Sequence, residues 1–546
     1  MRAPSRGISL LLSCVLLHAL ATAQTTYDVD PAGNNLSDGR SPHNAWRTVG
    51  RVNRGEFKPG DSILFKRSGT WYEELRPPAS GAPGRPVTYG AYGAGPGPVI
   101  DAGGALAGWD DPGRWVEVAP DIWQTRTDLY PGRLWLSGRE YGTCGNTKGG
   151  GSTTPDARYR WWGNGQGILE VYSPRNPALE YRSMEVANKG RLAMRIERKQ
   201  WLRFIGMTFR RGEICIDVLD GDNLLFDSCT VLAGTAKYGL WLRGGSDFGE
   251  VRNCLFDRED TVLHPFQFAG EAGDGNGQDN IALQYANGWN IHHSVIANPG
   301  HDAVSLSGEQ AGDETWRSCR NSIHHNLVWM AGDYGRFTST NGKDDPALCS
   351  DNEIYCNVIR GMTVQSQILG RHNLLHDNLF RDSRSVPWEK THWHSCVVEL
   401  SDYLNAAGDH NCIWYNTIVN ADANAISVRS GTRRASVRNN LIVNTGNRRG
   451  AEGQDFLDHV GIVLWPGAVT DTIVDNVIWC GGQDPVVYRE PGWDHNTKRS
   501  VSWFNAQNGK DGNVIHGNIS VDPRLDARLM PRNRTIKAGR RDGCER

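Results

Sequence analysis

The six residues LHDNLF, Leu375 to Phe380, carry the pattern that decides the fold of this 546-residue chain. The pattern is apolar-x-x-Asn-x-apolar, and it recurs through the second half of the sequence. Its other copies are Ile323 to Val328, Ile354 to Ile359, Ile413 to Ile418, Val437 to Ile442 and Ile473 to Ile478. Earlier copies place Cys229, Cys254 and Ser294 in the Asn position, and a degenerate copy lies near Asn518. The shortest steps are 21, 24 and 25 residues, and the longer steps correspond to the same period plus an inserted loop.

A repeat of about 20 to 25 residues with one short strand segment per period is typical of a solenoid. The segments are rich in Ile and Val and bounded by Gly, Asn and Asp, as strands are. Stacking them at the strand spacing of about 4.8 Å would place each Asn above the next in a hydrogen-bonded ladder. The sequence therefore predicts an all-β fold, a parallel β-helix. The alternative, a leucine-rich horseshoe, needs an L-x-x-L-x-L frame that is absent.

The first 23 residues are predicted to be a cleaved signal peptide. They combine two arginines, an apolar run from Ile8 to Leu17 and a small-residue cleavage site at Ala21 to Ala23. A lipoprotein signal at Cys14 is the alternative, but the apolar run continues past it. This run is too short to span a bilayer. We expect a secreted or periplasmic monomer without a membrane anchor. The net charge of −2, or −4 once the two arginines are removed, argues against a nucleic-acid partner.

The chain has twelve cysteines, of which eleven remain after cleavage, in a compartment that permits disulfides. Cys229 and Cys254 share the Asn position on successive copies, so they are either bridged or stacked as buried thiols, and we favour thiols. The better disulfide candidates bracket loops and are Cys349 with Cys356 and Cys396 with Cys412.

The region from Thr25 to Gly104 contains two characteristic stretches, TTYDVDPAGNNLSDGRSPHNAWRTV and FKPGDSILFKRSGTWYEELRPPASGAPGRPVTYGAYGAGPGPVIDAGG. They resemble the N-terminal region of secreted bacterial right-handed parallel β-helix proteins of the pectate-lyase-like superfamily. That set includes polysaccharide lyases of the alginate and chondroitinase B type and several glycoside hydrolase families. The resemblance implies a right-handed β-helix and secretion, whereas it does not select one activity.

Five segments follow from these signals. They are the signal peptide (1–23), the leader and first coils (24–104), a β-rich insertion (105–187), the parallel β-helix (188–525) and a basic C-terminal tail (526–546). The insertion is predicted to pack against the N-terminal end of the solenoid and to cover a sheet edge. The tail, with seven basic and three acidic residues, is expected to be disordered or loosely docked.

Counting from the Asn positions places three acids, Asp279, Asp302 and Asp333, on consecutive coils, beside His301 and Arg336. Carboxylates on adjacent coils would lie about 5 Å apart, which suits a retaining glycosidase, and like charges at that distance raise one pKa. We predict that Asp302 and either Asp279 or Asp333 serve as the acid and the nucleophile or base, with His301 as a further catalytic candidate. The alternative is turn chemistry, because Asp at a strand start commonly binds backbone amides.

A second reading is a polysaccharide lyase acting on a uronic-acid polymer. In it Lys343 would abstract a proton while Arg336, Arg371 or Ca²⁺ neutralises the uronate. The hydrolase reading requires no cofactor, and the identity of any metal ligands stays open. The lyases that the leader resembles use such a Lys and Arg with carboxylate-bound Ca²⁺, but their Glu-containing metal motif is not in register here.

The long inserted loops of the middle coils are expected to wall a groove for a polysaccharide or oligosaccharide, with aromatic side chains that stack on sugar rings. The substrate-binding candidates are Arg336, Lys343, Trp388, Trp393, His394 and Glu399. The favoured function is therefore a secreted glycoside hydrolase. A polysaccharide lyase and a non-catalytic carbohydrate-binding surface protein are the alternatives.

Overall fold

The computed structural model describes most of the chain from residue 24 onward. The described residues are 24–129, 131–141, 161–163, 167–188, 190–232, 238–258, 279–330, 335–342, 345–361, 366–384, 396–400, 408–422, 424–446, 460–489, 496–533, 535–541 and 543–544. The predicted signal peptide lies outside them. None of the described residues belongs to a helix long and apolar enough to cross a membrane.

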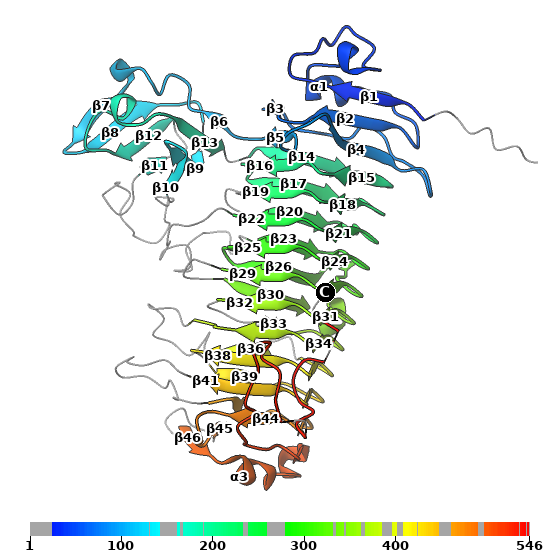
Figure 1. Cartoon of the computed structure of the whole chain (residues 1–546), viewed down its shortest axis with the longest axis vertical. Helices are drawn as coiled ribbons and strands as arrows, with labels where there is room; N and C mark the ends of the chain where they lie inside the picture. Colours follow the sequence, from blue (N-terminus) through cyan, green and yellow to red (C-terminus); the bar gives the residue numbers. More distant parts are fainter. Residues whose placement is uncertain are drawn as a thin grey trace, which may run out of the picture.

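Three long, mainly parallel sheets run along the solenoid, and each coil of its middle contributes one strand to each sheet (Figure 1). The 14-stranded sheet contains β1 (Thr26–Val29), β2 (Ser62–Lys66), β4 (Val87–Tyr92), β15 (Leu202–Ile205), β18 (Leu225–Asp227), β21 (Glu250–Arg252), β24 (Asn290–His292), β28 (Ser322–His324), β31 (Glu353–Tyr355), β34 (Leu374–His376), β37 (Cys412–Trp414), β40 (Ser436–Arg438), β43 (Thr472–Val474) and β47 (Val514–His516).

The 12-stranded sheet contains β3 (Thr70–Trp71), β5 (Val99–Asp101), β16 (Thr208–Arg210), β19 (Thr230–Leu232), β22 (Leu255–Asp257), β25 (Val295–Ala297), β29 (Leu327–Trp329), β32 (Val358–Arg360), β35 (Leu379–Arg381), β38 (Thr417–Ala421), β41 (Leu441–Thr445) and β44 (Val477–Trp479).

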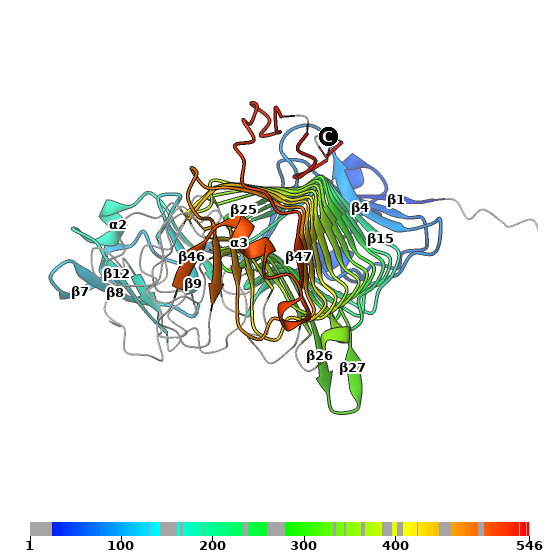
Figure 2. The same ribbon diagram turned by 90° about the horizontal axis from the view of Figure 1, so that it is seen from below.

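The 13-stranded sheet contains β14 (Leu192–Glu197), β17 (Ile214–Leu219), β20 (Tyr238–Arg243), β23 (Asp279–Gln284), β26 (Asp302–Ala311), β30 (Arg336–Gly342), β33 (Ser366–Ile368), β36 (Cys396–Leu400), β39 (Asn424–Val428), β42 (Ile462–Leu464), β45 (Val486–Arg489), β46 (Asn496–Arg499) and β27 (Glu314–Trp316). Strand β27 pairs with the end of β26 as an antiparallel hairpin that projects from the solenoid (Figure 2). The predicted parallel β-helix is confirmed.

The Asn positions form the predicted ladder at the corner between the 14-stranded and 12-stranded sheets. The side-chain amides of Asn326, Asn357, Asn378, Asn416, Asn440, Asn476 and Asn518 are buried and linked from coil to coil, Nδ2 to Oδ1, at 2.9 to 3.2 Å. The residue before each Asn has a left-handed backbone, for example Asp377 (φ 55°) and Asn439 (φ 57°). Asn and Asp tolerate this conformation best, which explains the polar residues found there.

The ladder continues toward the N-terminus through smaller side chains. The backbone N–H of Cys254 donates to Ser294 Oγ (3.1 Å), and that of Ser294 donates to Asn326 Oδ1 (3.0 Å). Cys229 and Cys254 are buried free thiols, as favoured from the sequence. Inside the corner, one apolar residue per coil, such as Ile354 and Leu375, is fully buried in a core that runs along the solenoid.

The insertion forms two antiparallel four-stranded sheets around its own apolar core. Its elements are β6 (Gly104–Ala105), β7 (Val116–Ala119), β8 (Ile122–Arg126), β9 (Pro131–Leu136), β10 (Arg139–Tyr141), β11 (Trp161–Gly163), β12 (Ile168–Tyr172), α2 (Pro177–Glu180) and β13 (Met184–Asn188). It lies to the side of the first coils, where Arg211 forms an ion pair with Glu185 and covers the Trp135 ring (Figure 1). Helix α1 (Val49–Val52) instead closes the N-terminal end of the solenoid, with both valines buried in its core.

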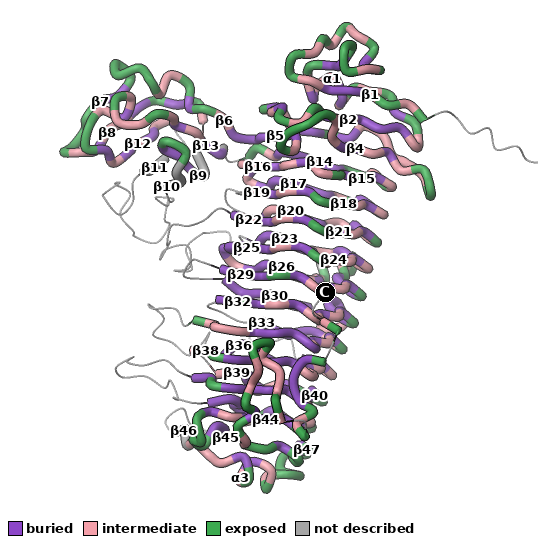
Figure 3. Tube along the Cα trace, viewed as in Figure 1, coloured by how far each residue is buried: buried purple, intermediate pink, exposed green. Residues whose placement is uncertain are grey.

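The other end is closed by α3 (Val501–Asn505), whose Val501 and Phe504 are buried in the core of the solenoid. The described residues also contain four short 3₁₀ turns. These turns are η1 (Pro42–Asn44), η2 (Pro112–Arg114), η3 (Pro346–Leu348) and η5 (Lys510–Gly512). Figure 3 shows that the strands are largely buried, whereas exposed residues gather in the insertion and at the two ends.

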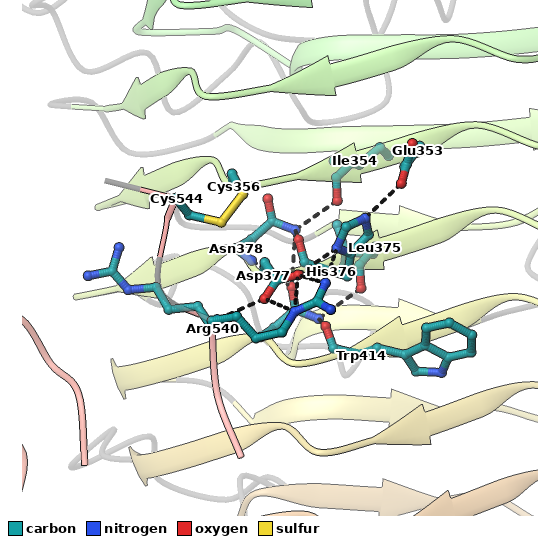
Figure 4. Close-up of polar contacts among 12 residues, drawn as sticks. Glu353, Ile354, Cys356, Leu375, His376, Asp377, Asn378, Trp414, Arg540 and Cys544 are labelled. Atoms are coloured by element: carbon teal, nitrogen blue, oxygen red, sulfur yellow. Dashed lines mark hydrogen bonds and ion pairs between the residues drawn. A yellow bond between two sulfur atoms is a disulfide. The ribbon is translucent and has the colours of Figure 1, made fainter. Parts of the chain in front are cut away.

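The C-terminal segment differs from the loose tail expected from its charge. It packs Ala538 against Leu441 and Val443 on the outside of the 12-stranded sheet, and Arg541 forms an ion pair with Asp377. A disulfide joins Cys544 to Cys356 (Figure 4). The segment is thus tied to the solenoid at Cys356 and Asp377, about two thirds of the way along the chain.

The predicted disulfides are wrong, because Cys349 and Cys412, one member of each predicted pair, are free thiols and Cys356 pairs with Cys544. The bridging partner lies 188 residues away in sequence, so loop bracketing gave no signal for it.

Candidate active site

The candidate site lies at the strand starts in the middle of the 13-stranded sheet. Asp279 begins β23, Asp302 begins β26 and Arg336 begins β30. Asp302 pairs with Arg336 on the next strand, and the pairing of Ile281 with Val304 brings Asp279 level with Asp302. The prediction that Asp279 and Asp302 stand on neighbouring coils is therefore confirmed, whereas the position after Asp302 holds an arginine.

Asp279 is a nearly buried carboxylate that accepts three hydrogen bonds. Its Oδ1 accepts from the backbone N–H of Asp302 and lies 3.0 Å from His301 Nδ1. Its Oδ2 accepts from Ser305 Oγ at 2.5 Å. An Asp side chain at a turn commonly accepts a hydrogen bond from a nearby backbone N–H, as Asp279 does here. The contacts with His301 and Ser305 go beyond this turn interaction and form a cluster of polar side chains.

Asp302 is fully buried and is held by the side chain of Arg336. Arg336 Nε lies 2.6 Å from Oδ1 and Nη2 lies 3.1 Å from Oδ2, so the guanidinium binds both carboxylate oxygens. Ser339 Oγ donates a further hydrogen bond to Oδ2 at 2.6 Å. Burial opposes ionisation of Asp302, but the charges of Arg336 and His301 outweigh it and hold the pKa well below its usual range. Asp302 is therefore a permanently ionised, enclosed group.

His301 is the most accessible member of the cluster, with 30% of its side chain exposed. Its Nδ1 lies 3.0 Å from Asp279 and 3.3 Å from Asp302, and Arg336 Nη2 contacts Nε2. Burial and Arg336 favour the neutral ring, whereas Asp302 and Asp279 favour the charged ring. The carboxylates prevail and raise the pKa of His301 to about 9. The imidazole is then protonated at neutral pH.

The polar network continues on the following strands at the register position of Ser305 and Ser339, three residues beyond that of Asp302 and Arg336. Arg336 contacts Gln367 Oε1, Gln367 Nε2 donates to Glu399 Oε2 at 3.0 Å, and Glu399 forms an ion pair with Arg429. Burial raises the pKa of Glu399, although the Arg429 charge opposes this. The predicted residue Glu399 therefore belongs to the network, three strands beyond Asp302.

Five of the residues predicted for the site fall in parts of the chain that the structure does not describe. Asp333, Lys343, Trp388, Trp393 and His394 lie outside the described residues. The register that would stack Asp333 on Asp302 is wrong, since Arg336 pairs with Asp302 there. The prediction counted a fixed number of residues from the Asn position of each coil to the start of the next strand. That number varies from coil to coil, because the connecting loops differ in length.

Sequence reasoning missed Ser305, Ser339, Gln367 and Arg429, which complete the hydrogen bonding of the cluster. A weak signal exists: each serine follows a site residue at a strand start by three positions, in Asp302-x-x-Ser305 and Arg336-x-x-Ser339. The sequence gives no comparable signal for Gln367.

Asp279, His301 and Asp302 offer ligand atoms within 4.8 Å of one another, so the cluster was tested as a metal site. Ca²⁺ takes six to eight oxygen ligands, but here one donor is an imidazole and the Asp302 carboxylate is bound through both oxygens by Arg336. The two acids are balanced in charge by Arg336 and the protonated His301. These residues fit Ca²⁺ poorly.

An aromatic pair flanks the cluster. Tyr238 pairs with Asp279 on the preceding strand and stacks on Trp241 with ring centroids 5.1 Å apart. Gln284 fixes both rings, because it accepts from Trp241 Nε1 at 2.8 Å and donates to the Tyr238 hydroxyl at 2.9 Å. Burial raises the pKa of Tyr238, which therefore stays neutral. Trp241 is half-buried and presents part of its ring beside the site.

The fold and this cluster define a right-handed parallel β-helix protein with a polar network on its 13-stranded sheet. No protein-family model matches the chain, and a comparison with curated protein sequences found no match. Among solved structures, the chain is similar to a glycoside hydrolase (TM-score 0.45, 12% identity, 95% of this chain and 100% of that chain covered).

It is also similar to a GH136 lacto-N-biosidase from Eubacterium ramulus (TM-score 0.41, 12% identity, 91% and 67% covered). A third similar structure is the PL6 family polysaccharide lyase Pedsa3628 from Pseudopedobacter saltans (TM-score 0.46, 11% identity, 90% and 95% covered). At these identities and TM-scores the likenesses do not bear on activity, so function is inferred from the site.

Proposed function

We propose that this protein is a carbohydrate-active enzyme that hydrolyses glycosidic bonds, with His301 as the proton donor. The observation that carries the proposal is the position of His301. It is the accessible member of an otherwise buried cluster, and two carboxylates raise its pKa to about 9. A protonated, oriented imidazole is suited to protonate a leaving oxygen, which is the general-acid step of glycoside cleavage.

The neighbouring groups have distinct roles in this mechanism. Asp302 and Arg336 are positioning residues, because each is buried and bound by the other. The proton offered to the glycosidic oxygen is the one on His301 Nε2, so Arg336 Nη2 has to withdraw from that atom when substrate binds, while Arg336 Nε keeps its contact with Asp302. Asp279, whose Oδ1 lies 3.0 Å from His301 Nδ1, is also a positioning residue, because it is nearly buried and favours the charged ring. His301 thus replaces Asp302 as the proton donor, because Asp302 has no exposed surface.

Hydrolysis is preferred over β-elimination because of the cations at the site. A lyase needs a positive charge that neutralises the substrate carboxylate. Arg336 and Arg429 already bind Asp302 and Glu399. Arg371, the other arginine considered from the sequence, lies 3.6 Å from Asp409. Each of these three arginines, all within the described residues, therefore already pairs with a carboxylate of the protein. This favours a reaction in which no substrate carboxylate has to be neutralised.

The aromatic pair supports a saccharide substrate. Trp241 lies one strand before Asp279 and three residues further along its strand, and aromatic faces supply stacking area for sugar rings. Arg243 covers part of the Trp241 ring at 4.3 Å from its centroid, so the ring is held in a fixed orientation.

A screen of neutral and uronic polysaccharides tests the proposal. Each reaction is read for new reducing ends and for the ultraviolet absorbance of an unsaturated uronate product. Reducing ends without that absorbance support hydrolysis, whereas both signals together would establish the lyase. Binding of a polysaccharide without either signal would indicate a non-catalytic carbohydrate-binding protein.

A further inference from the structure

Four histidines form a compact patch on the 14-stranded sheet, apart from the candidate active site. The His patch consists of His292 and His293 at the end of β24 and His324 and His325 at the end of β28. The two strands pair in register, with His292 opposite His324. As a result the rings stack: His292 lies 4.9 Å from His324 at an interplanar angle of 2°, and His293 lies 5.2 Å from His325 at 3°.

Within each coil the two imidazoles face one another through the same ring atom. His292 Nδ1 lies 2.7 Å from His293 Nδ1, and His324 Nδ1 lies 2.8 Å from His325 Nδ1. The left-handed backbone of His293 (φ 51°) and His325 (φ 54°) makes this possible. Successive side chains of an extended strand point to opposite faces, whereas here the corner brings both rings together.

Hydrogen bonds at the opposite ring atoms fix the tautomer of two of these histidines. His292 Nε2 lies 2.9 Å from Glu250 Oε1, and His324 Nε2 lies 2.8 Å from Asn290 Oδ1. Both partners are acceptors, so each Nε2 carries the proton and each Nδ1 presents a lone pair. In protein metal sites, a histidine that binds the metal through one ring nitrogen usually donates the N–H of the other to a carboxylate or carbonyl oxygen, as His292 and His324 do here.

We propose that the His patch binds a late transition-metal ion of the Zn²⁺, Ni²⁺ and Cu²⁺ class. Neutral imidazole nitrogen is a preferred ligand of these metals. In a tetrahedral site with Zn–N bonds of about 2.0 to 2.1 Å, two nitrogens lie about 3.3 Å apart. Each Nδ1 pair therefore has to open by about half an ångström. His293 and His325 free their Nδ1 atoms by moving the proton to their outer Nε2, so no net proton release is required.

One ion per chain is expected. A second divalent ion on the neighbouring coil would lie about 5 Å from the first, and the two would repel. The bound ion would bridge the two imidazoles of one coil on the outside of the solenoid. Because it would bind only the folded protein, its stabilisation of the fold is expected to rise with the logarithm of its free concentration above Kd.

The test measures Zn²⁺ and Ni²⁺ binding by calorimetry and the melting temperature with each metal. The paired variant H293N/H325N removes one Nδ1 from each coil and leaves the anchored histidines in place. We expect at least tenfold weaker binding and loss of the metal-induced rise in melting temperature. The matched control is H372N/H410N, a second histidine pair that lies just before β34 and β37 of the same sheet, with ring centroids 4.9 Å apart. Its ring Nδ1 atoms instead face Asp351 and Asp409.

Each outcome decides the proposal. Loss in H293N/H325N with retention in H372N/H410N supports it. Equal binding by all three proteins, equal loss in both variants, or no metal-induced stabilisation of the wild type would overturn it. Circular dichroism of each variant without metal establishes that the fold is intact.

Discussion

Asp471 occupies a position that asparagine fills on the next coil and on several earlier coils, and replacing it by Asn is expected to stabilise the protein at pH 8. A second ladder links Asn321, Asn352 and Asn373 by side-chain contacts, and Asp471 lies in its continuation, where its backbone N–H donates to Asn513 Oδ1. Asp471 is 1% exposed, and burial raises its pKa to about 7.

The direction in which stability changes with pH follows from the difference between the folded and unfolded pKa of Asp471. An acid with a raised folded-state pKa stabilises the fold while it is protonated, below its unfolded pKa near 3.8. That contribution is lost as the pH rises toward the folded value of about 7. A difference of about three pKa units, at about 1.4 kcal/mol each, sets an upper limit of about 4 kcal/mol. Asn cannot ionise, and its Nδ2 can donate to the preceding coil as Asn513 Nδ2 does to Ala468 O.

The assay is thermal and denaturant unfolding of the wild type and D471N between pH 4 and pH 8. We expect the advantage of D471N to be smallest at pH 4 and to grow by about 1 to 4 kcal/mol by pH 8. D351N is the control, because the Asp351 side chain is 55% exposed on the same sheet. A pH-independent difference, or an equal response in D351N, would refute the reasoning.

Three further predictions concern the site and the C-terminal segment. Adding Ca²⁺ to metal-free protein should leave the melting temperature unchanged, because Arg336 and His301 already balance the two acids; a rise would indicate a cation bound at the acids. Turnover should decline above about pH 9 as the proton donor His301 is lost, and a profile flat to pH 10 would exclude it as the acid. C544S should lower stability by about 2 to 5 kcal/mol and expose the C-terminal segment to protease, since the disulfide closes 188 residues; unchanged proteolysis would show that packing alone holds the segment.

The fold was predictable because the pattern that specifies it is local and repeated. Each coil bends at a left-handed residue followed by a buried Asn, and both requirements leave a residue-type signature, as in Asp377-Asn378. The strand register follows from that signature, since a ladder allows only one alignment of the coils. The disulfide partner Cys544 was not predictable, because it lies outside the repeats and joins the solenoid through one long-range contact.

The site was predictable only in part. Asp279, His301 and Asp302 come together as expected, because all three were located by counting residues from a single repeat position, Ser294. Beyond them the coils differ in loop length, so Arg336 rather than Asp333 follows Asp302. Burial also could not be inferred: sequence gives no sign that Asp302 is enclosed by a guanidinium while His301 remains accessible.

The most direct test of the catalytic assignment is the turnover of H301Q on a polysaccharide that the wild type cleaves. The account predicts a loss of about 10² to 10⁴ in kcat with little change in KM and an intact fold by circular dichroism, because a general acid is removed. H372Q, a histidine 3.7 Å from a carboxylate on another sheet, should keep wild-type turnover. Wild-type turnover by H301Q, or an equal loss in H372Q, would contradict the account.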